Sequence, residues 1–152
     1  MSHIIDCNAP PEIPDDYQVE RHLKGGMLEW SPAKVRLLEP CGEDRHYDCF
    51  HLDWRDGWWE FCYPKMLNAN VLDFLLNHRE CIPDEWKYHT IAFMGTEYRR
   101  HEKRLVCCLN GSGRTGMSWS GMYADVRSCR HYHVAVFDVF GPPAQFNAIR
   151  AY

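Results

Sequence analysis

The chain has 152 residues, of which 45% are hydrophobic and 14% aromatic, and its formal net charge at pH 7 is -4. This length suits one hydrophobic core, so we expect residues 1–152 to form a single domain. No segment approaches the ~18 consecutive apolar residues of a transmembrane helix. The N-terminus also lacks the basic and apolar regions of a signal peptide. Together these features predict a cytoplasmic protein with no membrane partner.

Eight cysteines are many for that compartment, but their spacing shows no disulfide framework. In a reducing cytosol such cysteines are free thiols that pack as small apolar side chains. We therefore expect no disulfides.

The N-terminal third contains mostly irregular or extended patterns. Three prolines between positions 10 and 14 predict that residues 1–20 form an extended or poorly ordered arm that buries little. Ser31 followed by Pro32 predicts a short helical turn. An Asp-Gly pair between aromatic-rich runs predicts a β-hairpin over residues 47–63.

The clearest helix signal begins at Asn68, which is a good N-cap residue. Leu67 and Leu72 occupy the positions of a hydrophobic staple around it. The apolar side chains expected on the buried face of this helix are Val71, Leu72, Leu75 and Leu76. Pro83 then opens a second short turn that carries Trp86, so we expect a compact helical hairpin.

The second half of the chain is rich in β-branched and aromatic residues. The predicted strands cover residues 88–99, 104–109, 117–127 and 131–140. Their short connections cannot hold a parallel crossover, so neighbouring strands should be antiparallel. The run from Val134 is apolar on both faces and predicts the most buried strand. We therefore predict an α+β fold, an antiparallel β-sheet with a short helical hairpin packed on one face.

Four segments resemble an uncharacterised family of small bacterial proteins. They read LEWSP at 28–32, LNANVLDFLL at 67–76, IPDEWK at 82–87 and GTEYR at 95–99, matching the family's LEWxP, LNANVLD, IPxEWK and GTxYR patterns. The resemblance extends over residues 22–127. It implies a bacterial protein but no activity, substrate or site, because the family has none assigned.

Residues 108–116 also resemble the C-x-x-G-x-G-R-T-G loop of protein tyrosine phosphatases, position for position. In those enzymes the loop holds phosphate at a helix N-terminus. The resemblance implies that Cys108 is the nucleophile, Arg114 the phosphate clamp and Asp84 a candidate acid.

Two features oppose this resemblance. Cys107 stands where the phosphatase pattern has a histidine that stabilises the thiolate. Residues 117–123 alternate in polarity, which suits a strand better than the required helix. The sequence therefore favours a glycine-rich β-turn, with a cysteine-dependent phosphatase as the alternative. A helix within residues 114–127 would favour catalysis, and a strand would oppose it.

Two groups of residues with metal-ligating side chains are also present. The first is His46, Cys49 and His51, and the second is Cys129, His131 and His133. Neither has a standard zinc spacing, so we expect no metal and no cofactor, with a zinc-binding protein as a further alternative. The candidates for an exposed aromatic binding platform are Tyr88, Tyr98, Trp119 and Tyr123, but aromatic residues at strand spacing more often pack in the core, and the sequence favours that interpretation.

The local excess of positive charge consists of Arg99, Arg100, Lys103 and Arg104. Because these are too few for strong phosphate-backbone binding, we predict a solvated hairpin loop and no nucleic-acid partner. A protein partner or self-association remains open, and no catalytic or binding residue is assigned. The sequence leaves enzymatic activity undecided and favours a binding or interaction module.

Overall fold

The computed structural model describes residues 2–38, 65–111, 119–126 and 132–137. Its strands are β1 (Ile4–Asp6), β2 (Gln18–His22), β3 (Met27–Glu29), β4 (Val35–Leu38), β5 (Thr90–Arg100), β6 (Lys103–Gly111), β7 (Trp119–Asp125) and β8 (His133–Phe137). Its helices are η1 (Pro32–Lys34), α3 (Ala69–Asn77), η3 (Arg79–Cys81) and η4 (Asp84–Tyr88), of which α3 alone is an α-helix. The hairpin predicted over residues 47–63 lies outside the described residues.

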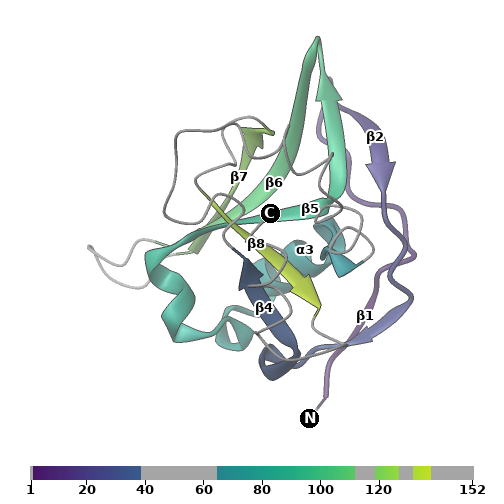
Figure 1. Ribbon diagram of the computed structural model, residues 1–152. Helices are drawn as coiled ribbons and strands as arrows, with labels where there is room; N and C mark the ends of the chain where they lie inside the picture. The colour runs from purple at the N-terminus through teal and green to yellow at the C-terminus, as the bar shows by residue number, and fades with distance from the viewer. Residues whose placement is uncertain (1, 39–64, 112–118, 127–131, 138–152) are drawn as a thin grey trace, which may run out of the picture.

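Six of these strands form one sheet in the order β4-β8-β5-β6-β7, with β2 pairing to β5, and β1 pairs with β3 separately. The fold is therefore α+β, as predicted. The sheet is mixed rather than purely antiparallel, because β8 runs parallel to β5 and antiparallel to β4. Figure 1 shows β8 between β4 and β5 rather than beside β7. The antiparallel prediction is confirmed for β5, β6 and β7, because β6 pairs antiparallel with both β5 and β7.

Helix α3 packs across β5, β6 and β7 on one face of the sheet, and Figure 1 shows it behind the strands. The predicted N-cap is confirmed, because the Asn68 side chain accepts a hydrogen bond from the Asn70 backbone N–H at 3.1 Å. Leu72 and Leu75 are buried, while Leu76 is only partly buried. These apolar side chains therefore determine which side of α3 faces the sheet.

The predicted helical hairpin is wrong, because the segment after α3 contains only the short 3-10 helices η3 and η4. Pro83 does precede the turn that carries Trp86, as the sequence indicates. The proline ring prevents one continuous helix, and segments of three and five residues are too short to nucleate a second α-helix. Trp86 anchors this region by an edge contact with Trp30, with ring centroids 6.2 Å apart.

The N-terminal segment is more firmly attached than the sequence suggests. Ile5 and Cys7 are buried in the core, contrary to the expectation that this arm buries little. Helix α3 also binds its backbone, because Asn70 Nδ2 donates to the carbonyl oxygens of Asp6 and Ala9 at 3.0 and 2.8 Å. The sequence does not indicate this attachment, because Asn70 and the backbone carbonyl groups that it binds lie far apart in the chain.

The two faces of the sheet carry separate apolar clusters. The face under α3 includes Ile91, Phe93, Leu105, Cys107, Leu109 and Ala135. The opposite face includes Ala92, Met94, Val106, Cys108, Val134 and Val136. This alternation follows from the two-residue period of strands. In β8 three consecutive residues are fully buried, so the strand is covered on both faces as its sequence indicates. The prediction that it is the most buried strand is wrong, because β5 has eight consecutive buried residues at the centre of the sheet.

Candidate binding cleft

The phosphatase-like residues do not form an exposed catalytic loop in the described part. Cys108 has no exposed surface and lies within β6, opposite Ala92 and Met122. Trp119 begins β7, which pairs antiparallel with β6, so residues 119–125 form a strand. Arg114 lies outside the described residues. The strand is the outcome that opposes catalysis, because a nucleophile in mid-strand has neither solvent access nor a helix N-terminus beside it.

We expect the thiols of Cys7 and Cys108 to resist alkylation in the native protein. Both are buried, and burial together with the Asp6 carboxylate raises the pKa of the Cys7 thiol to about 11. Timed iodoacetamide labelling with peptide mass spectrometry should modify the half-buried Cys81 first, and the other two only on unfolding. Native labelling of Cys108 before Cys81 would contradict the described burial.

The metal-capable groups fall mostly outside the described ranges, and of their six residues only His133 is placed. Its ring lies 4.1 Å from that of His89, measured between centroids. Within the described ranges, no three His, Cys, Asp or Glu side chains come together as a metal site would require.

The four aromatic residues do not form one exposed platform, and the expectation that strand aromatics pack in the core is confirmed for two of them. Tyr98 and Trp119 are buried, whereas Tyr88 is 70% exposed in η4. Instead, Tyr98 and Tyr123 contact each other edge to face at 5.4 Å between centroids. Tyr17 joins them at 6.1 and 4.9 Å. No sequence pattern indicates this trio, because Tyr17 comes from the N-terminal segment.

Three residues of the basic run, Arg99, Arg100 and Arg104, interact with other groups of the chain. Arg104 donates from one nitrogen to both carboxylate oxygens of Glu97, at 2.9 and 2.8 Å, and Glu97 is only 2% exposed. Arg99 forms an ion pair with Glu20. The Arg100 guanidinium lies over the Tyr17 ring, 5.5 Å from its centroid. These residues therefore stabilise the β5–β6 hairpin and its contact with β2.

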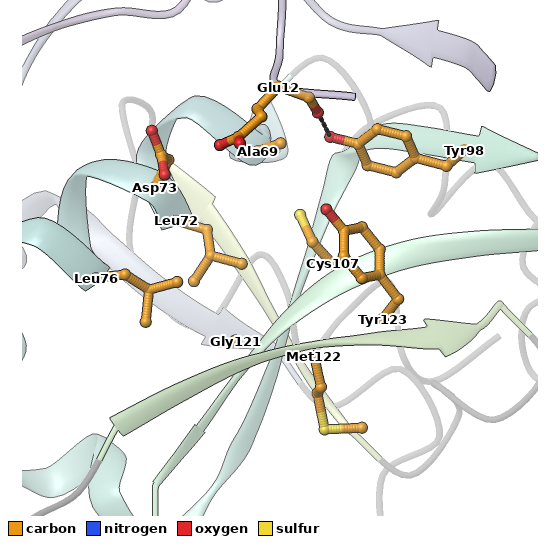
Figure 2. Close-up of a pocket in the computed structure, with 10 residues that line it drawn as sticks. All are labelled: Glu12, Ala69, Leu72, Asp73, Leu76, Tyr98, Cys107, Gly121, Met122 and Tyr123. Carbon is orange, nitrogen blue, oxygen red and sulfur yellow. Dashed lines mark hydrogen bonds between the residues drawn. The ribbon is translucent and has the colours of Figure 1, made fainter. Parts of the chain in front are cut away.

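A cleft of about 280 Å³ opens between α3, the sheet and the N-terminal segment. Figure 2 shows its wall, which is formed by Glu12, Ala69, Leu72, Asp73, Leu76, Tyr98, Cys107, Gly121, Met122 and Tyr123. The Tyr123 hydroxyl and the Cys107 sulfur point toward the space between α3 and Glu12, and the Met122 side chain is turned away (Figure 2). Apolar side chains therefore line most of the α3 side of the cleft, and the hydroxyl groups of the tyrosines make the opposite side polar.

Two exposed carboxylates, Glu12 and Asp73, border the cleft. Tyr98 fixes the position of Glu12, because its hydroxyl donates a hydrogen bond to the Glu12 carbonyl oxygen at 3.1 Å. Neither carboxylate forms an ion pair within the described ranges. Their negative charge therefore faces the cleft without a cation from the described chain.

The other ionisable groups of the cleft are neutral near pH 7. Burial, the neighbouring Cys107 and Tyr17, and the charges of Glu12 and Asp73 raise the pKa of Tyr123 to about 12. Burial is also the main reason why the pKa values of Tyr98 and Cys107 lie above their ordinary ranges. The carboxylates therefore supply the charge of the cleft, and the phenols supply neutral hydroxyl groups.

Gly121 allows the close approach of α3 to β7. A Cβ atom at this position would lie 2.9 Å from Leu76 Cδ1. On β7, residues 121 and 123 share the face toward α3, so Leu76 occupies the space that a side chain at position 121 would fill, beside Tyr123.

Among the cleft residues, the sequence points to Tyr98, Tyr123 and Cys107 through candidate motifs, and to Leu72 and Leu76 only as part of the buried face of α3. Glu12 and Asp73 lie on separate elements, and isolated acidic residues carry no local signal of a site. Their proximity depends on the N-terminal segment crossing the start of α3, which the hydrogen bonds of Asn68 and Asn70 to that segment produce.

Comparison with known proteins finds no matching family model, and no curated protein or solved structure shows significant similarity to the chain. The resemblance to small bacterial proteins therefore stays a prediction. In the described ranges, no helix combines the length and apolar character needed to span a bilayer.

Proposed function

We propose that the protein is a binding module whose cleft takes a positively charged group on a short aliphatic stem. The observation that carries this proposal is the pair of exposed carboxylates, Glu12 and Asp73, at the edge of a cleft whose other ionisable groups are neutral. Opposite charge favours association, and the effect is strongest where solvent is partly excluded. A cysteine-dependent phosphatase is not proposed, because Cys108 is buried within a strand.

The remaining wall suits such a ligand. Ala69, Leu72 and Leu76 provide an apolar surface for methylene groups. Tyr123 is exposed and its hydroxyl points into the cleft (Figure 2), so its oxygen is available to accept from a ligand N–H. Small-molecule pockets usually measure about 300–1,000 Å³, so this cleft fits a side-chain-sized group rather than a nucleotide. The Arg100 guanidinium lies over the ring of Tyr17, which contacts the cleft tyrosines, and this cation–π contact supports the preference for a cation.

The test uses n-butylammonium and n-butylguanidinium as probes, followed by NMR chemical shifts of the protein amides. We expect saturable shifts around Asp73, Cys107 and Tyr123, and weaker binding at higher salt. Asp73→Asn and Glu12→Gln should each weaken binding about two- to fivefold, because an exposed charge pair contributes about 0.5–1 kcal/mol. Asp84→Asn, which removes an exposed carboxylate in η4, is the matched control and should have no effect.

Neutral n-butanol and anionic butyrate complete this test. Equal binding of n-butanol and n-butylammonium would show that the cleft recognises the stem alone. Equal weakening by Asp84→Asn and Asp73→Asn would show that only the overall charge matters. Either result would refute the proposed function. The cytoplasmic location and the bacterial origin stay predictions beside it.

A further inference from the structure

Strand β7 forms one edge of the six-stranded sheet. It pairs with β6 along its whole length, from Trp119 opposite Gly111 to Asp125 opposite Leu105. No other described strand pairs with it. Such an edge presents backbone N–H and C=O groups that another chain can pair with.

Proteins usually protect their edge strands with charged residues, proline or short length. Edge strand β2 contains Glu20 and Arg21, and edge strand β4 is four residues long and contains Arg36. Strand β7 has seven residues and no proline, and its one charged residue is the terminal Asp125. Ser120, Gly121 and Tyr123 are exposed on it. It is therefore the least protected edge among the described strands.

The cleft lies directly beside this edge, since Gly121 and Tyr123 belong to both. On an added strand, the side chain opposite Gly121 would have its Cβ about 4.5–5.5 Å from the glycine and on the same face as α3. A long basic side chain at that position would pass beside Leu76 and Tyr123 into the cleft that both residues line. Its charge would then lie near the carboxylate of Asp73.

We infer that the natural ligand of the cleft is the side chain of a lysine or arginine in an extended peptide, which binds by adding a strand to β7. This inference rests on the proposed function and specifies the partner as a protein segment. Main-chain hydrogen bonds along β7 supply affinity, and the acidic cleft selects a basic residue at one position. This division of roles is general for peptides that extend a sheet.

The experiment compares N-acetyl-lysine-amide with the blocked pentapeptide Thr-Val-Lys-Val-Thr by calorimetry and amide NMR. We expect the pentapeptide to bind at least about tenfold more tightly, with slower hydrogen exchange of the β7 amides. Replacing its lysine with norleucine should weaken binding about fivefold or more, because it removes the charge that faces both carboxylates, and Asp73→Asn in the protein should weaken it about two- to fivefold. In an extended peptide the N–H groups of alternate residues point to opposite edges, and only one edge pairs with β7. We therefore compare a peptide N-methylated at residues 2 and 4 with one N-methylated at residues 1, 3 and 5. One of them should lose the N–H groups that pair with β7 and be inactive, and the other should keep them and bind.

The outcomes separate this inference from the proposed function. If N-acetyl-lysine-amide binds as tightly as the pentapeptide, the strand addition is refuted and the cation-binding cleft stands. If both N-methylated peptides retain full affinity, the backbone takes no part and the inference is likewise refuted. Tight binding of the norleucine peptide refutes the role of the acidic cleft. If no probe binds, the proposed function fails as well.

Discussion

Leu75→Ala should lower the free energy of unfolding by about 2–5 kcal/mol, through the lost transfer energy of the side chain and the cavity left behind. Leu75 has no exposed surface and lies in the apolar cluster between α3 and the sheet. The residues of this cluster are themselves buried and packed, so they have little freedom to fill the cavity. Urea denaturation followed by circular dichroism measures the effect.

Asp73→Ala is the matched control on the same helix, since Asp73 is exposed. Substitutions at such positions usually change stability by less than about 0.5 kcal/mol. Equal unfolding midpoints for Leu75→Ala and the unmodified protein would show that this face of α3 is not the buried one.

Gly95→Ala should cost about 3 kcal/mol, at the upper end of the range for overpacking, because the added Cβ meets backbone rather than a flexible side chain. It would lie 2.7 and 2.8 Å from the carbonyl oxygens of Met66 and Leu67, and 2.9 Å from the Asn68 nitrogen. Gly95 also donates its N–H to the Leu67 carbonyl at 3.0 Å and accepts from the Leu23 N–H at 2.7 Å. The substitution must therefore separate β5 from the start of α3.

Thermal denaturation of Gly95→Ala beside Gly25→Ala tests this prediction. At Gly25 the nearest atom to an added Cβ is the Cys7 Cβ, a side-chain atom at 3.2 Å, so the cost should be smaller. If the two variants have the same melting temperature, the close approach at Gly95 is not a source of stability.

The sequence predicts those features that depend on neighbouring residues. Asn68 caps α3 because its side chain reaches an N–H two residues away, and that geometry is encoded locally. The β5–β6 hairpin and β7 likewise follow from alternation and short connections. The extra residues in β5 between Phe93 and Glu97, where Gly95 lies, leave no such pattern, because the irregularity is fixed by contact with residues 66–68.

The placement of β8 and the cleft could not be predicted, for a common reason. Alternation shows that residues 133–137 form a strand but not which strands they join, and the parallel pairing with β5 depends on long-range packing. The cleft similarly combines Glu12, Asp73 and Tyr123 from three separate regions. Such sites emerge from the topology, so an exposed acidic residue cannot be recognised as part of one in advance.

The position of β8 also constrains how the chain assembles. Among the described strands, β4 pairs only with β8, which is the last to be synthesised and lies between β4 and β5. The early β4 segment therefore has no place in the sheet until residues 133–137 have left the ribosome. Sheets built from such distant pairings fold in milliseconds to seconds rather than microseconds. During that interval β4 and the adjoining edge of β5 lack their β8 partner, and unpaired strand edges of this kind favour aggregation.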